Sequence, residues 1–259
     1  MHKVAISTAV ASEGSDVEHA FVFERRACVI IPAFMAEHSV ASVIRDVERA
    51  LPELAIIVVD DGSLDRTAEV ARAAGARVVR HERNRGKGAA LVTALTTADE
   101  LGFDMALSVD ADGQHPAESA RAVLFASSDP HAIVLGIRNL ERDGAPRKNQ
   151  FSNQISNFFL SRFAARPLQD TQCGLRRYPV KGTLALGARA RGFAFEAEVI
   201  LRAVAAAMPV VEEPVLVIYP PEDQRVTHFH VVRDPVRIIV AVLRTVHDLR
   251  ARKARGRRA

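Results

Sequence analysis

The sequence predicts an α/β fold, a mostly parallel open sheet flanked by helices. From residue 27 onward, short β-branched runs alternate with helical stretches of about ten to fifteen residues. Most of these runs end in Gly, Asp or Pro clusters, and the 259 residues are 48% hydrophobic and 25% charged, as in a globular chain. Alternation of this kind is typical of a parallel sheet covered by helices, with ligands bound beyond the carboxyl ends of the strands.

The elements follow in order along the chain. The first five expected strands are Cys28–Pro32, Ile56–Asp60, Arg77–His81, Met105–Asp110 and Ala132–Gly136. The helices between them are Glu37–Ala50, Asp65–Ala74, Lys87–Leu101 and Pro116–Ala126. A polar connection over residues 138–147 precedes helices at Asn149–Ala165 and Ala194–Ala207, a strand at Val210–Tyr219, and a helix starting near Pro235.

Three segments are expected: a lead-in over 1–26, the main domain over 27–232, and an amphipathic helix with a basic tail over 233–259. The apolar run Val4–Ala11 is too short to span a bilayer, and no later run reaches the roughly 18 residues required. Cys28 and Cys173 are expected to be reduced thiols in a cytoplasmic protein.

The positive charge is concentrated at the C-terminus. Six cations in the last ten residues exceed the net charge of +4, so the rest of the chain is net acidic. A nucleic-acid-binding body would need its own basic face, and with no Trp and two Tyr base-stacking platforms are scarce. We therefore expect no nucleic-acid partner.

Acidic residues end two of the predicted strands. Asp60 and Asp61 precede Gly62, Asp110 ends the fourth strand, and Asp112 follows it. Carboxylates at positions i and i+2 can direct hard oxygen ligands at one Mg²⁺ or Mn²⁺ ion. Each cluster alone is also compatible with a turn or a helix cap, but two clusters at two strand ends favour a ligand site.

A glycine-containing segment, Asn84-Arg85-Gly86-Lys87-Gly88, lies between the acidic clusters and opens a helix. Backbone N–H groups at such a helix start can bind a phosphate, although an ordinary turn with exposed cations gives the same pattern. The spacing is neither that of a P-loop nor that of a dinucleotide-binding Gly-X-Gly-X-X-Gly. ATP hydrolysis and nicotinamide chemistry are therefore disfavoured.

Four motifs, in this order, resemble those of family-two inverting glycosyltransferases, and most of all the dolichyl- or polyprenyl-phosphate mannose synthase-like enzymes. They are Ile-Pro-Ala-Phe at 31–34, Val-Asp-Asp-Gly-Ser at 59–63, Asn-Arg-Gly-Lys-Gly-Ala-Ala at 84–90 and Asp-Ala-Asp-Gly-Gln-His-Pro at 110–116. The resemblance covers residues 27 to 230. It implies a GT-A fold, a nucleoside-diphosphate sugar donor, and Mg²⁺ or Mn²⁺ as cofactor.

By this resemblance Asp60 contacts the nucleoside, Asp110 and Asp112 bind the ribose and the metal, and Gln114 is a further metal ligand. The matching motifs extend the donor site to Pro32, Ala33, Gly62, Lys87 and Ala111. The first strand departs from the family pattern, because Phe-Met-Ala stands where Tyr-Asn-Glu is usual. Glu37 is the candidate to replace the missing carboxylate.

Acceptor residues follow from the same resemblance. Arg138, in a segment like the family's Gly-Ser-Arg, and Arg147 would hold an acceptor phosphate, a role suited to guanidinium groups; the alternative is an exposed charged loop. A segment resembling Asp-Thr-Gln-Cys-Gly places Gln172, Cys173 and Gly174 in the sugar and acceptor pocket, with Cys173 as a packing thiol.

Four residues are candidates for the catalytic machinery: Asp112, Glu196, Arg225 and His228. Glu196 belongs to a Phe-Glu-X-Glu match and would act as a base only for a hydroxyl acceptor, since a phosphate is already anionic. It could otherwise complement the helix dipole. Arg225 and His228 resemble a segment near the donor diphosphate and would stabilise the leaving group, unless they form a surface loop.

The sequence therefore predicts an enzyme, an inverting, metal-dependent glycosyltransferase that moves a sugar to a lipid-linked, polyprenyl-phosphate-like acceptor. Transfer to a lipid or pigment hydroxyl is the alternative within the class. A nucleotidyltransferase and a non-catalytic sugar-nucleotide-binding subunit are the alternatives outside it.

The last helix suggests where the protein works. Apolar residues recur at helical spacing, at Val236, Ile239, Val240, Leu243, Val246 and Leu249. Such a helix can lie in a membrane interface or pack on the body of the protein. The basic tail over 250–259 would be attracted to an anionic membrane, so we expect a peripheral position at the inner face.

Overall fold

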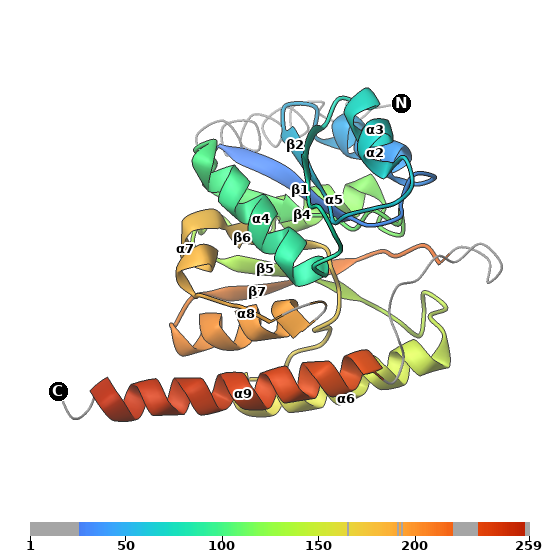
Figure 1. Cartoon of the computed structure of the whole chain (residues 1–259). Coiled ribbons are helices and arrows are strands. Elements are labelled where there is room, and N and C mark those ends of the chain that lie inside the picture. Colours follow the sequence, from blue (N-terminus) through green and yellow to red (C-terminus); the bar gives the residue numbers. More distant parts are fainter. Residues whose placement is uncertain (1–25, 165, 191, 193, 220–232, 257–259) are drawn as a thin grey trace, which may run out of the picture.

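The computed structural model describes residues 26–164, 166–190, 192, 194–219 and 233–256. Its seven-stranded sheet has the order β3-β2-β1-β4-β6-β5-β7 (Figure 1). The strands are β1 Ala27–Ala33, β2 Ala55–Asp60, β3 Arg77–Arg80, β4 Met105–Ser108, β5 Ile133–Arg138, β6 Arg176–Pro179 and β7 Val210–Val215. Only β6 is antiparallel to its neighbours, β4 and β5.

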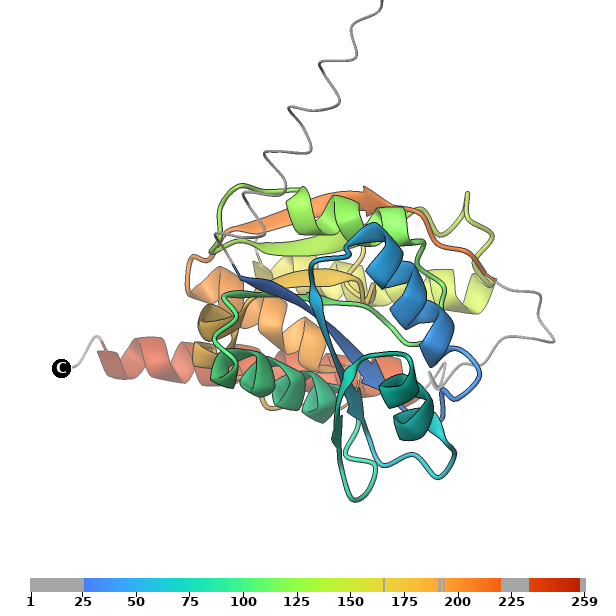
Figure 2. The ribbon, with the colours of Figure 1, turned by 90° about the horizontal axis from the view of Figure 1, so that it is seen from above.

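Helices cover both faces of the sheet (Figures 1 and 2). They are α2 Val40–Ala50, α3 Thr67–Ala73, α4 Lys87–Glu100, α5 Ala117–Phe125, α6 Arg147–Ala164, α7 Val180–Ala185, α8 Ala194–Ala205 and α9 Arg233–Gly256. Alternate residues of β1 enter two separate cores: Cys28 and Ile30 join α4, α6 and α8, whereas Val29 and Ile31 join α2 and α5. Both faces of the central strands are therefore buried, as in other parallel sheets.

The predicted fold class is confirmed, but the sequence did not reveal β6 and α7. The strand β6 begins with Arg176 and Arg177, which are both fully buried. Arg176 donates hydrogen bonds to the backbone carbonyls of Thr171, Cys173 and Glu196. These acceptors let a guanidinium enter the core, where an unpaired charge would be very costly.

Several boundaries also differ. The last strand ends at Val215 rather than at Tyr219, and the first helix begins at Val40 rather than at Glu37. Residues 36–39 form a turn, in which the Ser39 N–H donates to the Ala36 carbonyl. Most of the expected lead-in over 1–26 lies outside the described residues.

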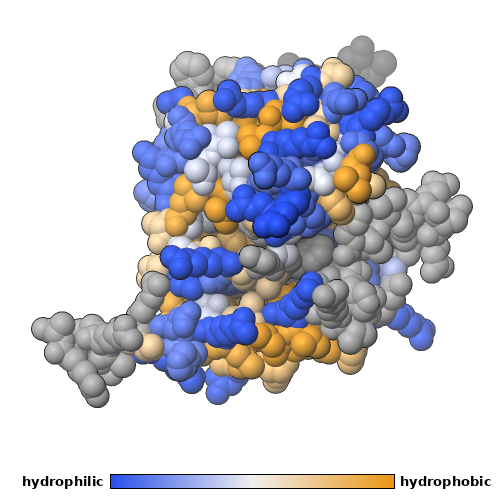
Figure 3. Space-filling model, viewed as in Figure 1, coloured by the Kyte–Doolittle hydropathy of each residue, from blue (hydrophilic) through white to orange (hydrophobic). Residues whose placement is uncertain are grey.

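The long helix α9 packs beside α6 and α8 (Figure 1). Ile238 and Val242 are buried against the body, while Val236, Val240 and Leu243 remain exposed. Figure 3 shows apolar side chains along the lower edge of the molecule, over α9 and α6. Among the described residues no helix is long and apolar enough to cross a membrane.

Candidate functional site

The carboxyl ends of β1, β2, β4 and β5 meet at one edge of the sheet. Asp60 ends β2 and is fully buried. Its Oδ1 accepts a hydrogen bond from the Ser63 N–H at 3.0 Å, and its Oδ2 lies 3.1 Å from Arg80 Nε. Gly62 has a φ of +74°, and a side chain there would collide with the backbone at Arg83. This turn therefore requires glycine.

Asp61, which the sequence analysis did not assign a role, holds the glycine-containing segment in place. Its carboxylate accepts hydrogen bonds from the N–H groups of Arg85 at 2.9 Å and Gly86 at 2.7 Å. It also lies 2.6 Å from His81 Nδ1. The segment is thereby fixed directly before Lys87, the first residue of α4.

Lys87 joins two carboxylates from distant parts of the chain. Its Nζ lies 2.7 Å from Asp110 Oδ1 and 3.2 Å from Glu196 Oε1. Burial alone would lower the pKa of Lys87, but the two carboxylates raise it above its ordinary value. Burial likewise opposes ionisation of Asp110, yet the Lys87 ammonium holds the pKa of Asp110 below its usual range. Lys87 and Asp110 are thus both charged at neutral pH.

Asp112 lies on the solvent-exposed side of the cluster formed by Lys87, Asp110 and Glu196. The side chain is exposed, and its Oδ1 accepts a hydrogen bond from the Gln114 N–H at 3.0 Å. Desolvation by the surrounding loops and repulsion from Asp110 raise the pKa of Asp112 to about 6. Because the Asp112 side chain is exposed, repulsion from Asp110 is the more direct cause of its raised pKa. A cation bound between the Asp110 and Asp112 carboxylates would relieve that repulsion.

These residues fit a divalent cation that is shared with a substrate. Within the described part of the chain, no three His, Cys, Asp or Glu side chains are grouped closely enough to hold a metal ion. Mg²⁺ usually binds through one or two carboxylates together with substrate phosphates. Asp110 and Asp112 match that requirement, and the half-buried Gln114 lies beside them.

The residues predicted to bind the acceptor lie around Arg138, at the end of β5. Arg138 Nε lies 2.7 Å from Asp170 Oδ2, and Nη2 lies 3.0 Å from Asp170 Oδ1. Burial would raise the pKa of Asp170, but the Arg138 guanidinium holds it below the usual range. Asp170 is the first residue of the segment that resembles Asp-Thr-Gln-Cys-Gly, and this motif position is the only sequence signal for its role.

A cavity of about 430 Å³ adjoins Arg138. Residues of β5 and α6 line it, including Gln150, Asn153 and Asn157. Asn153 is 3% exposed, and within the described structure its Oδ1 has no hydrogen-bond partner. Because a buried polar atom normally has a partner, this amide oxygen is suited to accept a hydrogen bond from a donor group in the cavity.

The segment over 172–174 connects the two halves of the site. Gln172 Nε2 donates to Ser156 Oγ at 2.8 Å, which ties the segment to α6. Cys173 is fully buried, and burial raises the pKa of its thiol to about 12, as expected for a packing residue. A side chain at Gly174 would collide with the Asp110 carboxylate.

Other predicted site residues have different surroundings. Pro32, Ala33 and Ala111 are buried, and Arg147 is exposed at the start of α6. Glu37 Oε2 accepts a hydrogen bond from the Arg66 N–H at 3.0 Å, so its carboxylate anchors the segment before α3. Arg225 and His228 lie outside the described residues.

The two carboxylates at the start of α8 are used differently. Glu196 is 1% exposed and faces Lys87. Glu198 accepts hydrogen bonds from the N–H groups of Arg189 and Ala190 and from Arg202 Nε. Glu198 therefore fixes the segment before the helix, while Glu196 belongs to the charged cluster.

Comparisons with known proteins agree with this geometry. Residues 28–181 match the sequence model of glycosyl transferase family 2. The UDP-N-acetylglucosamine–dolichyl-phosphate N-acetylglucosaminyltransferase of Methanococcus voltae is 28% identical over 214 residues, covering 74% of this chain and 85% of that enzyme. The undecaprenyl-phosphate 4-deoxy-4-formamido-L-arabinose transferase of Pseudomonas paraeruginosa is 31% identical over 160 residues, covering 58% of this chain and 46% of that enzyme.

Some of these relatives are considerably longer than the matched segment. The matched segment covers 46% of the length of the Pseudomonas enzyme. In an uncharacterized relative from Methanocaldococcus jannaschii, the matched segment covers 63% of the length. Among solved structures, glucosyl-3-phosphoglycerate synthase from Mycobacterium tuberculosis, in complex with Mn²⁺, uridine diphosphate and phosphoglyceric acid, superposes with a TM-score of 0.68. Its sequence is 20% identical, and the match covers 95% of this chain and 84% of that one.

Proposed function

The chain belongs to glycosyl transferase family 2 and has a GT-A fold, and from that premise we propose that it transfers a sugar from a nucleoside-diphosphate sugar to a polyprenyl-phosphate-like acceptor. Transfer proceeds with inversion at the anomeric carbon. The names of the archaeal and Pseudomonas relatives, which specify dolichyl phosphate and undecaprenyl phosphate, support this acceptor class.

On the donor side, Asp60 and Gly62 bind the nucleoside, with Pro32, Ala33, Glu37 and Ala111 around it. Asp110, Asp112 and Gln114 hold Mg²⁺ or Mn²⁺. When bound, the cation supplies Lewis-acid stabilisation of the departing diphosphate. The two neighbouring carboxylates and the raised pKa of Asp112 support this assignment. Arg225 and His228 are assigned to the leaving diphosphate on sequence grounds.

Lys87 sets the electrostatics of the donor side. With its ammonium 2.7 Å from Asp110 Oδ1, it keeps that carboxylate charged and in position at the edge of the sheet. The segment that Asp61 fixes leads directly into α4, whose positive N-terminal end begins at Lys87. The donor diphosphate would thus meet preorganised positive groups.

The position of Glu196 carries the choice of acceptor. A hydroxyl acceptor requires a carboxylate that can reach its proton, whereas a phosphate attacks without a base. Glu196 is almost fully buried, and its Oε1 lies 3.2 Å from Lys87 Nζ. Its carboxylate is therefore ion-paired with Lys87 and shielded from solvent. This favours a phosphate acceptor, bound beside Arg138, Gln172 and Gly174, with Arg147 nearby in sequence.

Turnover assays test the proposal. The purified chain is incubated with Mn²⁺ or Mg²⁺, a panel of UDP- and GDP-sugars, and a short polyprenyl phosphate. Release of nucleoside diphosphate together with a glycosylated lipid is the expected result. Release of sugar 1-phosphate, with the nucleotidyl group passed to the acceptor, would instead identify a nucleotidyltransferase, and donor binding with no product would identify a binding subunit.

The same proposal includes a peripheral position at the inner face of the membrane. A lipid-linked acceptor lies in a bilayer, and the basic tail over 250–259 can attract an anionic surface at about 1 kcal/mol for each cation near it. The exposed residues Val236, Val240 and Leu243 of α9 support contact with the same surface.

A further inference from the structure

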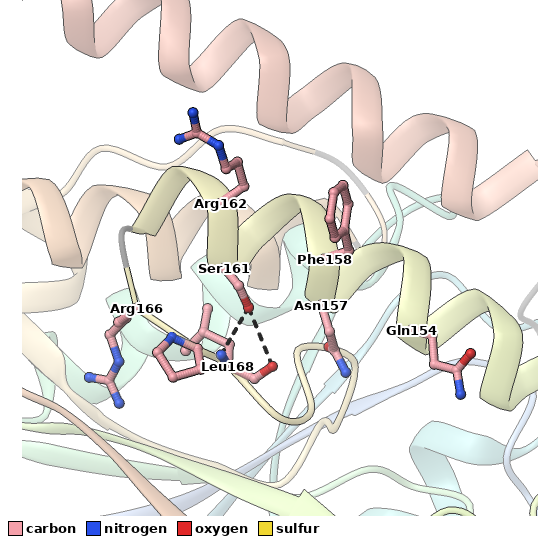
Figure 4. A pocket seen from close by; sticks show the side chains of 8 residues that line it. Gln154, Asn157, Phe158, Ser161, Arg162, Arg166 and Leu168 are labelled. Atoms are coloured by element: carbon pink, nitrogen blue, oxygen red, sulfur yellow. Dashed lines mark hydrogen bonds between the residues drawn. The ribbon is translucent and has the colours of Figure 1, made fainter.

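A second cavity lies next to the acceptor side, between α6 and the segment over 166–168. This groove has a volume of about 680 Å³. Phe158, Pro167 and Leu168 give it an apolar lining, and Arg162 and Arg166 also border it (Figure 4). Ser161 fixes its floor, because the Ser161 hydroxyl accepts a hydrogen bond from the Leu168 N–H at 2.9 Å.

The groove is continuous with the cavity beside Arg138. Gln154 and Asn157 line both spaces. Asn157 is held in place, since its Oδ1 accepts hydrogen bonds from the Thr171 N–H at 2.9 Å and the Thr171 hydroxyl at 2.8 Å. A ligand could therefore extend from the polar cavity into the apolar groove along a fixed side of α6.

We propose that this groove binds the hydrocarbon chain of a phosphate-ended acceptor whose phosphate lies beside Arg138. The inference rests on the proposed function and adds a chain-binding subsite to it. The polar cavity offers the Arg138 guanidinium, a group suited to a phosphate, and the groove that follows offers mainly carbon. This sequence of surfaces matches a phosphate followed by a chain.

The groove also distinguishes two acceptor classes. A small hydrophilic phosphate ester would occupy only the polar cavity and leave Phe158, which is 68% exposed, in water. A chain would cover this ring and the neighbouring Pro167. Each methylene buried there can raise affinity by up to about fourfold. The preference for acceptors with a hydrocarbon chain would thus come from the groove beside α6 and not from the site that binds the phosphate.

Binding of alkyl phosphates tests the subsite without any need for sugar transfer. Butyl, octyl and dodecyl phosphate, kept below their micelle concentrations, are titrated calorimetrically into the full chain and three variants. Phe158→Ser and Pro167→Asp each alter the groove. Phe151→Ser is the matched control, because Phe151 lies on the same helix, is 66% exposed, and is not part of the groove lining.

We expect affinity to rise with chain length in the parent and in Phe151→Ser. In Phe158→Ser and Pro167→Asp, dodecyl phosphate should lose at least tenfold in affinity while butyl phosphate is unaffected. Equal affinity for all three ligands in the parent would overturn the inference, as would equal losses in Phe151→Ser and Phe158→Ser, which would indicate a non-specific apolar surface.

The subsite and the proposed function can fail separately. If chain-dependent binding is lost in Phe158→Ser but no sugar is transferred to any prenyl phosphate, the subsite stands and the proposed activity is wrong. If five-carbon and twenty-carbon prenyl phosphates are glycosylated with the same KM, the activity stands and the subsite is wrong.

Discussion

Lys87 and Glu196 are 109 positions apart in the numbering and meet with Nζ 3.2 Å from Oε1. Lys87 begins α4, and Glu196 lies in the first turn of α8. Their pairing closes α4 against α8 beside the Asp110 carboxylate. Only a hydroxyl acceptor would need Glu196 as a general base. Substitution of Glu196 therefore distinguishes transfer to a phosphate from transfer to a hydroxyl.

Glu196→Gln should reduce turnover with a prenyl phosphate by less than about tenfold, because that acceptor needs no general base. A hydroxyl acceptor would lose about 10²- to 10⁴-fold. Steady-state kcat and KM for both acceptor types, with donor affinity measured in parallel, decide between the two. A loss of more than a hundredfold with the phosphate, at unchanged binding, would contradict the proposed acceptor.

Asp112→Asn should abolish the dependence of donor binding on Mn²⁺ while preserving the fold. The amide keeps the shape of the carboxylate but removes the charge that attracts the cation. The measurement is the thermal shift produced by a nucleoside diphosphate with and without Mn²⁺. Asp46→Asn is the control, since Asp46 pairs with the exposed Arg49 on α2. An undiminished Mn²⁺-dependent shift in Asp112→Asn would end the metal assignment.

Gly174→Ala should impair activity by at least tenfold, because the added methyl group would displace the Asp110 carboxylate. The expected stability cost is about 1–3 kcal/mol, the usual range for overpacking. Gly182→Ala in α7 provides the comparison, since the nearest atoms to its new methyl group would be side-chain atoms of Met208 and Pro179. Urea unfolding and turnover are measured on both variants. Full activity in Gly174→Ala would show that Asp110 can move without consequence.

Asp170→Asn should destabilise the protein by about 3–5 kcal/mol at pH 7, because it leaves Arg138 without its buried counter-ion. The pKa of Asp170 is lowered in the folded state, so its contribution is fully present above the unfolded value, near 3.9, and is lost as the pH falls from there through the lower folded value. The unfolding free energies of parent and variant, measured in urea at several pH values, should therefore begin to converge below about pH 4. Asp46→Asn, in an exposed ion pair, should cost less than about 1 kcal/mol at any pH.

Removal of residues 250–259 should abolish co-sedimentation with anionic vesicles at low salt and leave activity on a soluble acceptor analogue unchanged. The reason is electrostatic, since six cations lie in this segment. The buried contacts of α9 through Ile238 and Val242 precede the deletion and are retained. Unchanged vesicle binding would assign the attachment to the apolar side of α6 and α9 instead.

The strand ends of the donor half could be predicted from the sequence because local signals coincide there. Asp60, Asp110 and Asp112 each follow a short apolar run, and parallel strands bring such ends to one edge. The charged residues of the core could not be predicted. Arg176 reads as a surface residue, and only the folded positions of three backbone carbonyls explain its burial.

Pairing partners were also beyond the reach of the sequence. Arg138 was expected to bind an acceptor phosphate, and Glu37 to contact the nucleoside. In the structure Arg138 faces Asp170 and Glu37 faces Arg66. Both contacts join segments about thirty residues apart, and no local periodicity encodes such contacts. The proposed roles of both residues therefore depend on what the ligands add to these pairs.

The antiparallel strand β6 also has a consequence for biosynthesis. It pairs with β4 through Met105 and Pro179, and it brings Gly174 against Asp110. A nascent chain that ends before β6 contains the loop with Asp110 and Asp112. It lacks the segment at Gly174, against which Asp110 packs. Closing such long loops is slow, because the chain loses conformational entropy before the stabilising long-range contacts form. The site around Asp110 is therefore completed only after β6 has been synthesised and paired.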